Sequence, residues 1–191
     1  MFNQKYKEIE IKYQITDIAS FRNSLKKLGG KSSGEFFQRT TRFETVNRDL
    51  EKKGLFLRVR TGEENTLTIK RKSKEDKNYR EREEWETEIS NPEAVIKGLK
   101  ALGYTKLLIM EKYRETFILP SFPNLKVTID RLPFGNFTEI EGEEEDIEKM
   151  IAKLNLSGQE RITATYWRLH EEYSKKRGST EENIVFDPGT D

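Results

Sequence analysis

The sequence Glu8-Ile9-Glu10-Ile11-Lys12 lies within the first predicted strand, residues 5–15. In an extended strand, successive side chains point to opposite faces, so Glu8, Glu10 and Lys12 share one face and the two isoleucines lie on the other. A single strand of this kind would be an ordinary solvated strand, apolar inside and charged outside. Because rows of unlike charges recur on several later strands, we expect a closed β-barrel whose charged faces point into a wet interior.

Other segments extend this pattern along the chain. Strand-like alternation of apolar with charged or hydroxyl side chains covers residues 36–45, 55–61, 66–71, 80–89, 107–119, 125–131 and 137–141. Helical spacing of apolar residues predicts helices over residues 17–28, 91–102, 143–155 and 163–176. These helices can cover the apolar outer faces of the strands. The pattern therefore predicts a single α+β domain over residues 1–177, followed by a flexible tail over residues 178–191.

A short motif occurs twice. Leu25-Lys26-Lys27-Leu28-Gly29 recurs as Leu99-Lys100-Ala101-Leu102-Gly103, each time at the end of a predicted helix. Two copies of a strand–helix–strand unit would build the barrel from two related halves, and a chance match is the alternative.

Composition narrows the classes of function. The 191 residues include 35 Lys and Arg against 34 Asp and Glu, a net charge of +1, which does not favour a nucleic-acid-binding or membrane-binding surface. The chain has no cysteine and one histidine, His170, so thiolate metal sites and histidine-based catalysis are poorly supported. No segment is apolar enough to be a membrane span or a signal sequence, so we expect a soluble cytoplasmic protein.

The charges on the predicted inner faces are of two kinds. Guanidinium and ammonium groups bind phosphate oxygens, and carboxylates without Cys or His suit a hard divalent cation such as Mg²⁺ or Mn²⁺. The basic set is Lys12, Arg58, Arg60, Lys70, Arg82, Lys112, Arg114 and Lys126, and the acidic set is Glu8, Glu10, Glu84, Glu86, Asp130, Glu139 and Glu141. Together they indicate a metal–phosphate complex as the ligand. The alternative is that they pair as inter-strand salt bridges on solvated sheets.

The same residues carry a resemblance to a known family. The motifs are Glu8-x-Glu10-x-Lys12, Arg58-x-Arg60, Lys70, Arg82-x-Glu84-x-Glu86, Lys112-x-Arg114, Asp130 and Glu139-x-Glu141. In this order they resemble the CYTH family, also called triphosphate tunnel metalloenzymes, which includes class IV adenylyl cyclases, thiamine triphosphatases and inorganic triphosphatases. The resemblance spans residues 8 to about 170. Residues 130–135 and Tyr166 are most similar to the class IV adenylyl cyclase-like branch.

The resemblance implies an eight-stranded antiparallel barrel that holds a small-molecule triphosphate, such as ATP, inorganic triphosphate or thiamine triphosphate. It implies Mg²⁺ or Mn²⁺ as cofactor, with catalytic roles for Glu8 and Glu10. The implied metal ligands are Glu8, Glu10, Asp130, Glu139 and Glu141. The implied phosphate-binding residues are Lys12, Arg58, Arg60, Lys70, Arg82, Lys112 and Arg114.

One position departs from the family pattern. After a Gln, the family often has an acidic residue followed by Tyr-Phe, whereas this chain has Gln38 and then Arg42-Phe43. Arg42 either contacts phosphate or faces outward, and it bears on the identity of the substrate.

Three functions fit this pattern. The first is a metal-dependent phosphoryl-transfer enzyme, with triphosphate hydrolysis slightly favoured because an attacking water needs no pocket for a base. The second is a class IV-type adenylyl cyclase that makes cyclic AMP and pyrophosphate from ATP. The third is a non-catalytic binding module for polyphosphate or a nucleotide. None of these requires a nucleic acid or membrane partner, and a homodimer is compatible with each.

Overall fold

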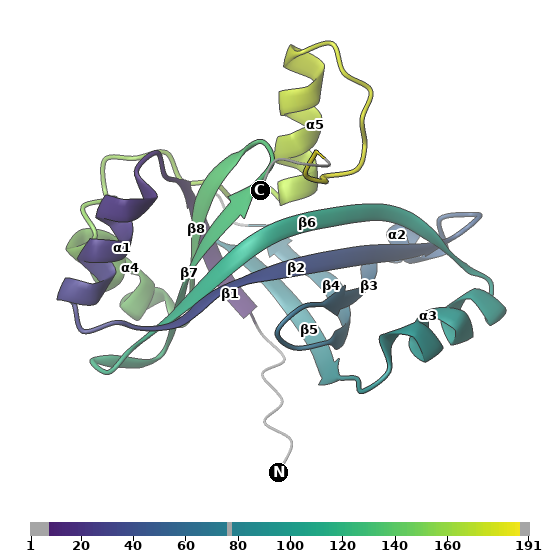
Figure 1. The fold of residues 1–191 in the computed structure, drawn as a ribbon, viewed down its shortest axis with the longest axis horizontal. Helices are drawn as coiled ribbons and strands as arrows, with labels where there is room; N and C mark the ends of the chain where they lie inside the picture. Colours follow the sequence, from purple (N-terminus) through teal and green to yellow (C-terminus); the bar gives the residue numbers. More distant parts are fainter. Residues whose placement is uncertain (1–7, 76–77, 188–191) are drawn as a thin grey trace.

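The structure, a computed structural model, describes residues 8–75 and 78–187 (Figure 1). Eight strands form a closed barrel in the order β1-β5-β4-β3-β2-β6-β7-β8, and each neighbouring pair is antiparallel. The strands are β1 Glu8–Gln14, β2 Lys31–Thr45, β3 Leu55–Thr61, β4 Thr66–Glu75, β5 Arg80–Glu88, β6 Tyr104–Leu119, β7 Phe122–Leu132 and β8 Gly135–Glu141. The predicted antiparallel barrel is confirmed. Residues 5–7 of the first predicted strand lie outside the described residues.

Helices cover the outside of the barrel at both ends. They are α1 Ile18–Lys27, α2 Asp49–Lys52, α3 Pro92–Ala101, α4 Glu144–Lys153 and α5 Tyr166–Lys176. Figure 1 shows α1 and α4 at one end of the barrel and α3 at the other. Under α1 and α4 lies the largest apolar core, which includes Ile11 of β1 and Ile140 of β8. Since the apolar faces of the strands pack outward against helices, the charged faces turn inward.

The repeated motif has a structural counterpart. It places Gly29 after α1 and Gly103 after α3, with φ angles of 82° and 88°. A left-handed residue after the last turn ends a helix, and glycine adopts this conformation without a steric penalty. The strands that follow, β2 and β6, pair with each other over most of their length. The two copies therefore encode the same helix stop before the two longest strands.

Several boundaries and one element differ from the prediction, and β4 ends at residue 75 instead of 71 while β7 begins at residue 122 instead of 125. β2 begins at residue 31 instead of 36, and β6 at residue 104 instead of 107, because the two strands extend their shared ladder beyond the region of apolar alternation. The short helix α2 was not predicted. At its start, the backbone N–H groups of Leu50 and Glu51 donate hydrogen bonds to the buried carboxylate of Glu44. This contact stabilises the helix, which has no periodic apolar residues by which the sequence could predict it.

The predicted flexible tail is packed against the barrel in its described part, up to residue 187. Ile184 is fully buried in a small core that includes Met110 and Tyr166. Its backbone pairs with β6, where Ile184 N–H donates to the carbonyl of Ile109 at 2.9 Å. Phe186 N–H donates to the carboxylate of Glu111 at 3.1 Å. Residues 183–186 thus add a short segment to the outside of β6, while residues 188–191 lie outside the described residues.

Candidate active site in the barrel

A cavity of about 910 Å³ occupies the barrel interior. Thirteen of the fifteen charged residues predicted for the inner faces line it: Glu8, Glu10, Arg58, Arg60, Lys70, Arg82, Glu84, Glu86, Lys112, Arg114, Lys126, Glu139 and Glu141. Lys12 and Asp130 are not among its lining residues, since they lie behind this layer. The charged strand faces therefore converge on one tunnel. Many of these charges do form inter-strand salt bridges, as the alternative reading expected, but the bridges face the cavity.

Carboxylates gather on β1 and β8. Glu10 and Glu141 are direct cross-strand partners, although like charges at such positions repel each other. Each is held by a basic side chain: Arg80 Nη1 lies 3.2 Å from Glu10 Oε1, and Lys126 forms an ion pair with Glu141. A pair of opposed carboxylates is stable only with positive charge close by, and this wall of the tunnel has that property.

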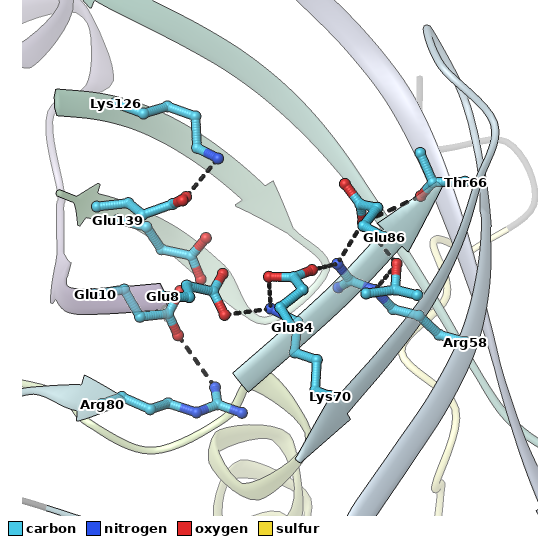
Figure 2. Close-up of polar contacts among 12 residues, drawn as sticks. Glu8, Glu10, Arg58, Thr66, Lys70, Arg80, Glu84, Glu86, Lys126 and Glu139 are labelled. Carbon is cyan, nitrogen blue, oxygen red and sulfur yellow. Dashed lines mark hydrogen bonds and ion pairs between the residues drawn. The ribbon is translucent and has the colours of Figure 1, made fainter. Parts of the chain in front are cut away.

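Glu8 extends the acidic wall toward β4 and β5. Lys70 Nζ lies 2.5 Å from Glu8 Oε2 and 3.1 Å from Glu84 Oε2, and Figure 2 shows the three side chains converging in the lumen. Burial would raise the pKa of Glu8, but Lys70 and Arg58 outweigh it and lower the pKa to about 2. Burial raises the pKa of Glu84. Lys70 thus keeps Glu8 ionised beside a second carboxyl.

The wall opposite the acidic strands is basic. In the ring of eight strands, β3 is four positions from β8, so Arg58 and Arg60 lie across the tunnel from Glu139 and Glu141. Glu86 holds both arginines, with contacts of 3.4 Å to Arg58 Nη2 and 3.1 Å to Arg60 Nη2. Burial opposes ionisation of Glu86, but the two arginines lower its pKa to about 2. The two guanidinium groups are oriented by this carboxylate before any ligand binds.

A buried network surrounds Asp130, next to the lining of the tunnel. Its side chain is fully buried and accepts hydrogen bonds from Lys112 Nζ at 3.0 Å, Arg114 Nε at 2.6 Å and Tyr166 Oη at 2.8 Å. Arg114 also pairs with Glu139. Burial and the neighbouring Arg114 lower the pKa of Lys112 to about 7, against the opposite effect of Asp130. Asp130, expected among the metal ligands, does not line the cavity and has both oxygens engaged, so its geometry suits the positioning of Arg114.

Lys12 also lies behind the lining. It is 1% exposed, its Nζ lies 2.7 Å from Glu139 Oε1, and it stands 4.5 Å from the centroid of the Tyr166 ring. Burial would raise the pKa of Glu139, but Lys12 and Arg114 hold it well below its ordinary value. Lys12 therefore orients a carboxylate of the tunnel wall instead of facing the cavity.

Several lining residues were absent from the predicted site. Among them are Lys72, Arg80, Tyr166 and Trp167, whereas Lys126 belongs to the predicted basic set and Arg42 was named as a possible phosphate contact. Arg80 belongs to the same alternating row as Arg82, so the strand pattern contained the signal for it. Tyr166 and Trp167 come from the start of α5, and no periodicity in the sequence places that helix at the tunnel.

The donor set fits a hard divalent cation. Within the described ranges, no three acidic or histidine side chains converge as a ready metal site, because ammonium and guanidinium groups hold the carboxylates. The ligand atoms on β1 and β8 are all carboxylate oxygens, and the opposed pair Glu10 and Glu141 would gain from added positive charge. These carboxylates therefore suit Mg²⁺ or Mn²⁺ when the cation takes the place of their basic partners.

Comparisons with known proteins agree with this architecture. The family model described as the CYTH domain matches residues 6–177. A Methanocaldococcus jannaschii protein named "Putative adenylate cyclase" is 29% identical over 173 residues, which covers 85% of this chain and 97% of that protein. Across the described part of the chain, no helix has the length and apolar character of a membrane span.

Solved structures share the fold. A structure described as a "putative adenylate cyclase" from Vibrio parahaemolyticus has a TM-score of 0.74 and 21% identity, and the match covers 86% of this chain and 97% of that one. A "putative adenylyl cyclase" from Hippeastrum, described as having a dominant triphosphatase activity, has a TM-score of 0.61 and 18% identity over 91% of this chain and 97% of that one.

Proposed function

The chain belongs to the CYTH family, and from that premise we propose that it is a divalent-metal-dependent enzyme that hydrolyses a triphosphate bound in its tunnel. The observation that carries this proposal is that carboxylates and basic side chains line one and the same cavity. Carboxylates occupy β1 and β8, while Arg58 and Arg60 on β3 lie across the tunnel from β8. A polyanion with a bound divalent cation matches both walls at once.

Each wall has its own part in the reaction. Arg58, Arg60, Lys70, Arg82, Lys112 and Arg114 bind phosphate oxygens, and Glu8, Glu10, Glu139 and Glu141 hold the cation. Mg²⁺ or Mn²⁺ at this position supplies charge neutralisation and lowers the pKa of a bound water. Glu8 and Glu10 orient the water that attacks phosphorus. Asp130 and Lys12 act indirectly, by fixing Arg114 and Glu139 in place.

Positioning and charge neutralisation are most of what phosphoryl transfer requires of a protein. Glu86 and Asp130 already hold Arg58, Arg60 and Arg114 in the lumen, so little reorganisation is needed when phosphate binds. Such preorganised charges stabilise the transition state more effectively than solvent does. Hydrolysis requires no further feature of the site, because an attacking water needs no pocket for a nucleobase.

A second candidate is adenylyl cyclisation, in which the ribose 3′-hydroxyl of ATP attacks the α-phosphorus and pyrophosphate leaves. The relative from Methanocaldococcus jannaschii, named as a putative adenylate cyclase, supports it. Cyclisation also needs a pocket that orients the nucleoside. A third candidate, a binding module without turnover, requires only the two charged walls.

Product analysis separates the three functions. The protein is incubated with inorganic triphosphate, ATP or thiamine triphosphate, each with Mg²⁺ and with Mn²⁺, and every product is resolved by chromatography. Orthophosphate as the new product supports hydrolysis and identifies the substrate. Cyclic AMP with pyrophosphate from ATP would instead establish the cyclase, and binding without product would establish the module.

A further inference from the structure

Arg42 is an inward-facing arginine of β2 that the proposed reaction does not use. It lines the cavity and is the direct cross-strand partner of Arg58 on β3. Its guanidinium carbon lies 5.1 Å from the centroid of the Phe56 ring. Two arginines at opposed positions of neighbouring strands repel each other unless an anion lies between them.

The two arginines differ in their partners. Arg58 is within reach of two carboxylates, Glu84 at 3.5 Å and Glu86 at 3.4 Å. Among the described residues, Arg42 makes no hydrogen bond or ion pair, and its Nε is buried without a partner. Glu51 lines the same part of the cavity, but it pairs with Arg48 at 3.1 Å. Arg42 is thus a half-buried cation on the tunnel wall whose guanidinium has no carboxylate partner among the described residues.

The electrostatic environment of Arg42 agrees with this description. Burial lowers the pKa of Arg42, and the negative charges of Glu51 and Glu44 only partly oppose that effect. An unsatisfied buried donor is costly, so a bound anion that accepts from Nε would relieve that cost. Guanidinium groups bind phosphate oxygens through two parallel hydrogen bonds, which makes phosphate a suitable anion.

The space around Arg42 favours phosphate over an organic group. The cavity of about 910 Å³ is near the upper end of the range of about 300–1,000 Å³ that holds drug-sized ligands, so it has room beyond a triphosphate. Phe56 is the aromatic ring at this position, and Arg42 already stands over its face. A nucleobase or another flat ring therefore cannot stack there without displacing the guanidinium.

We propose that Arg42, beside Arg58, forms an additional anion subsite that binds a phosphate beyond the three held by the other basic residues. The preferred ligand is accordingly a linear inorganic polyphosphate of four or more phosphates. This inference rests on the proposed binding of a triphosphate in the tunnel. It adds the length of the phosphate chain.

The test compares two phosphate chains that differ by one unit. Titration calorimetry in EDTA, which prevents metal-dependent turnover, measures the Kd of inorganic triphosphate and of inorganic tetraphosphate. The variants are Arg42→Gln, Arg42→Lys as the charge-preserving replacement, and Arg131→Gln as a matched control. Arg131 also stacks on an aromatic ring, 4.4 Å from the centroid of Tyr113, but neither residue lines the cavity. Thermal melting confirms that each variant is folded.

We expect the wild-type protein to bind tetraphosphate roughly tenfold more tightly than triphosphate, the effect of one added charge-assisted contact. Arg42→Gln should bring the two Kd values to within about twofold of each other by weakening tetraphosphate binding alone, and Arg42→Lys should keep part of the preference. Equal affinities in the wild type, an equal loss for both chains in Arg42→Gln, or the same loss in Arg131→Gln would overturn the subsite. A wild-type protein that binds neither chain in EDTA would overturn the subsite, and the absence of turnover and of binding with Mg²⁺ or Mn²⁺ would overturn the proposed function.

Discussion

Tyr166, the first residue of α5, donates a hydrogen bond of 2.8 Å from its phenol oxygen to Asp130, near the C-terminal end of β7. Both side chains are buried, and the same carboxylate holds Lys112 and Arg114. One carboxylate therefore connects the helix to two basic residues that are proposed to bind phosphate.

Asp130→Asn should destabilise the protein far more than Tyr166→Phe. The amide leaves the buried Lys112 without its anion and removes one of the two anions that pair with Arg114, at a cost of about 3–5 kcal/mol, whereas loss of the phenol removes one neutral donor and costs about 1 kcal/mol. Urea unfolding followed by circular dichroism measures both variants. Similar costs for the two would show that Asp130 is not the anchor of this network.

Glu10→Gln should lower metal-dependent turnover by roughly 10²-fold or more, with little effect on the fold, because the change removes a charge that the cation requires. The control is Glu83→Gln on β5, whose carboxylate pairs with Arg71 at 3.2 Å outside the cavity. Initial rates with Mg²⁺ and Mn²⁺ are measured for both. Unchanged turnover in Glu10→Gln would remove Glu10 from the catalytic set.

Binding of triphosphate should weaken as the pH rises above 7. Lys112 has a pKa of about 7, so its ammonium is charged below that pH and attracts phosphate, and it becomes neutral above it. Calorimetry between pH 6 and 8.5 compares the wild type with Lys112→Gln. The titration of the triphosphate ligand affects both proteins equally and therefore cancels in the comparison. The affinity ratio of wild type to variant should fall toward one with increasing pH. A ratio that stays constant would contradict a titrating Lys112.

Glu86 should contribute to stability in a defined acid range. Its pKa is lowered from the ordinary value of 4.5 to about 2 in the folded protein, so the unfolded chain takes up its proton first as the pH falls. The stabilisation is fully present above pH 4.5 and is lost as the pH falls through 2. The difference in unfolding free energy between wild type and Glu86→Gln should therefore shrink over this range. A difference in unfolding free energy that stays constant over this pH range would rule out the ion pairs of Glu86 as the source of the stabilisation.

Ile184→Ala should lower the free energy of unfolding by about 2–4 kcal/mol, because the side chain is fully buried beside β6. Val46→Ala, at a side chain that is 83% exposed, serves as the control and should change it by less than about 0.5 kcal/mol. Chemical denaturation measures both. An effect of Ile184→Ala no larger than that of the control would mean that the C-terminal segment is loosely held in solution.

The sequence by itself determined the barrel and most of its lining. Alternation along each strand assigns every side chain to one of two faces, so the rows that contain Glu8, Arg58 and Glu139 could be placed inside before the structure was known. The duplicated helix stops at Gly29 and Gly103 were likewise visible as a local pattern.

Only the tertiary structure decided the depth of each inward side chain and its neighbours across the sheet. Lys12 and Asp130 belong to the predicted rows, yet they lie behind the cavity, because the order of strands and their register set which layer of the barrel each residue occupies. The pairing of Arg42 with Arg58 and the approach of Tyr166 join residues distant in sequence. Strand periodicity is a local property, whereas these contacts depend on register and on the packing of α5 against the closed barrel.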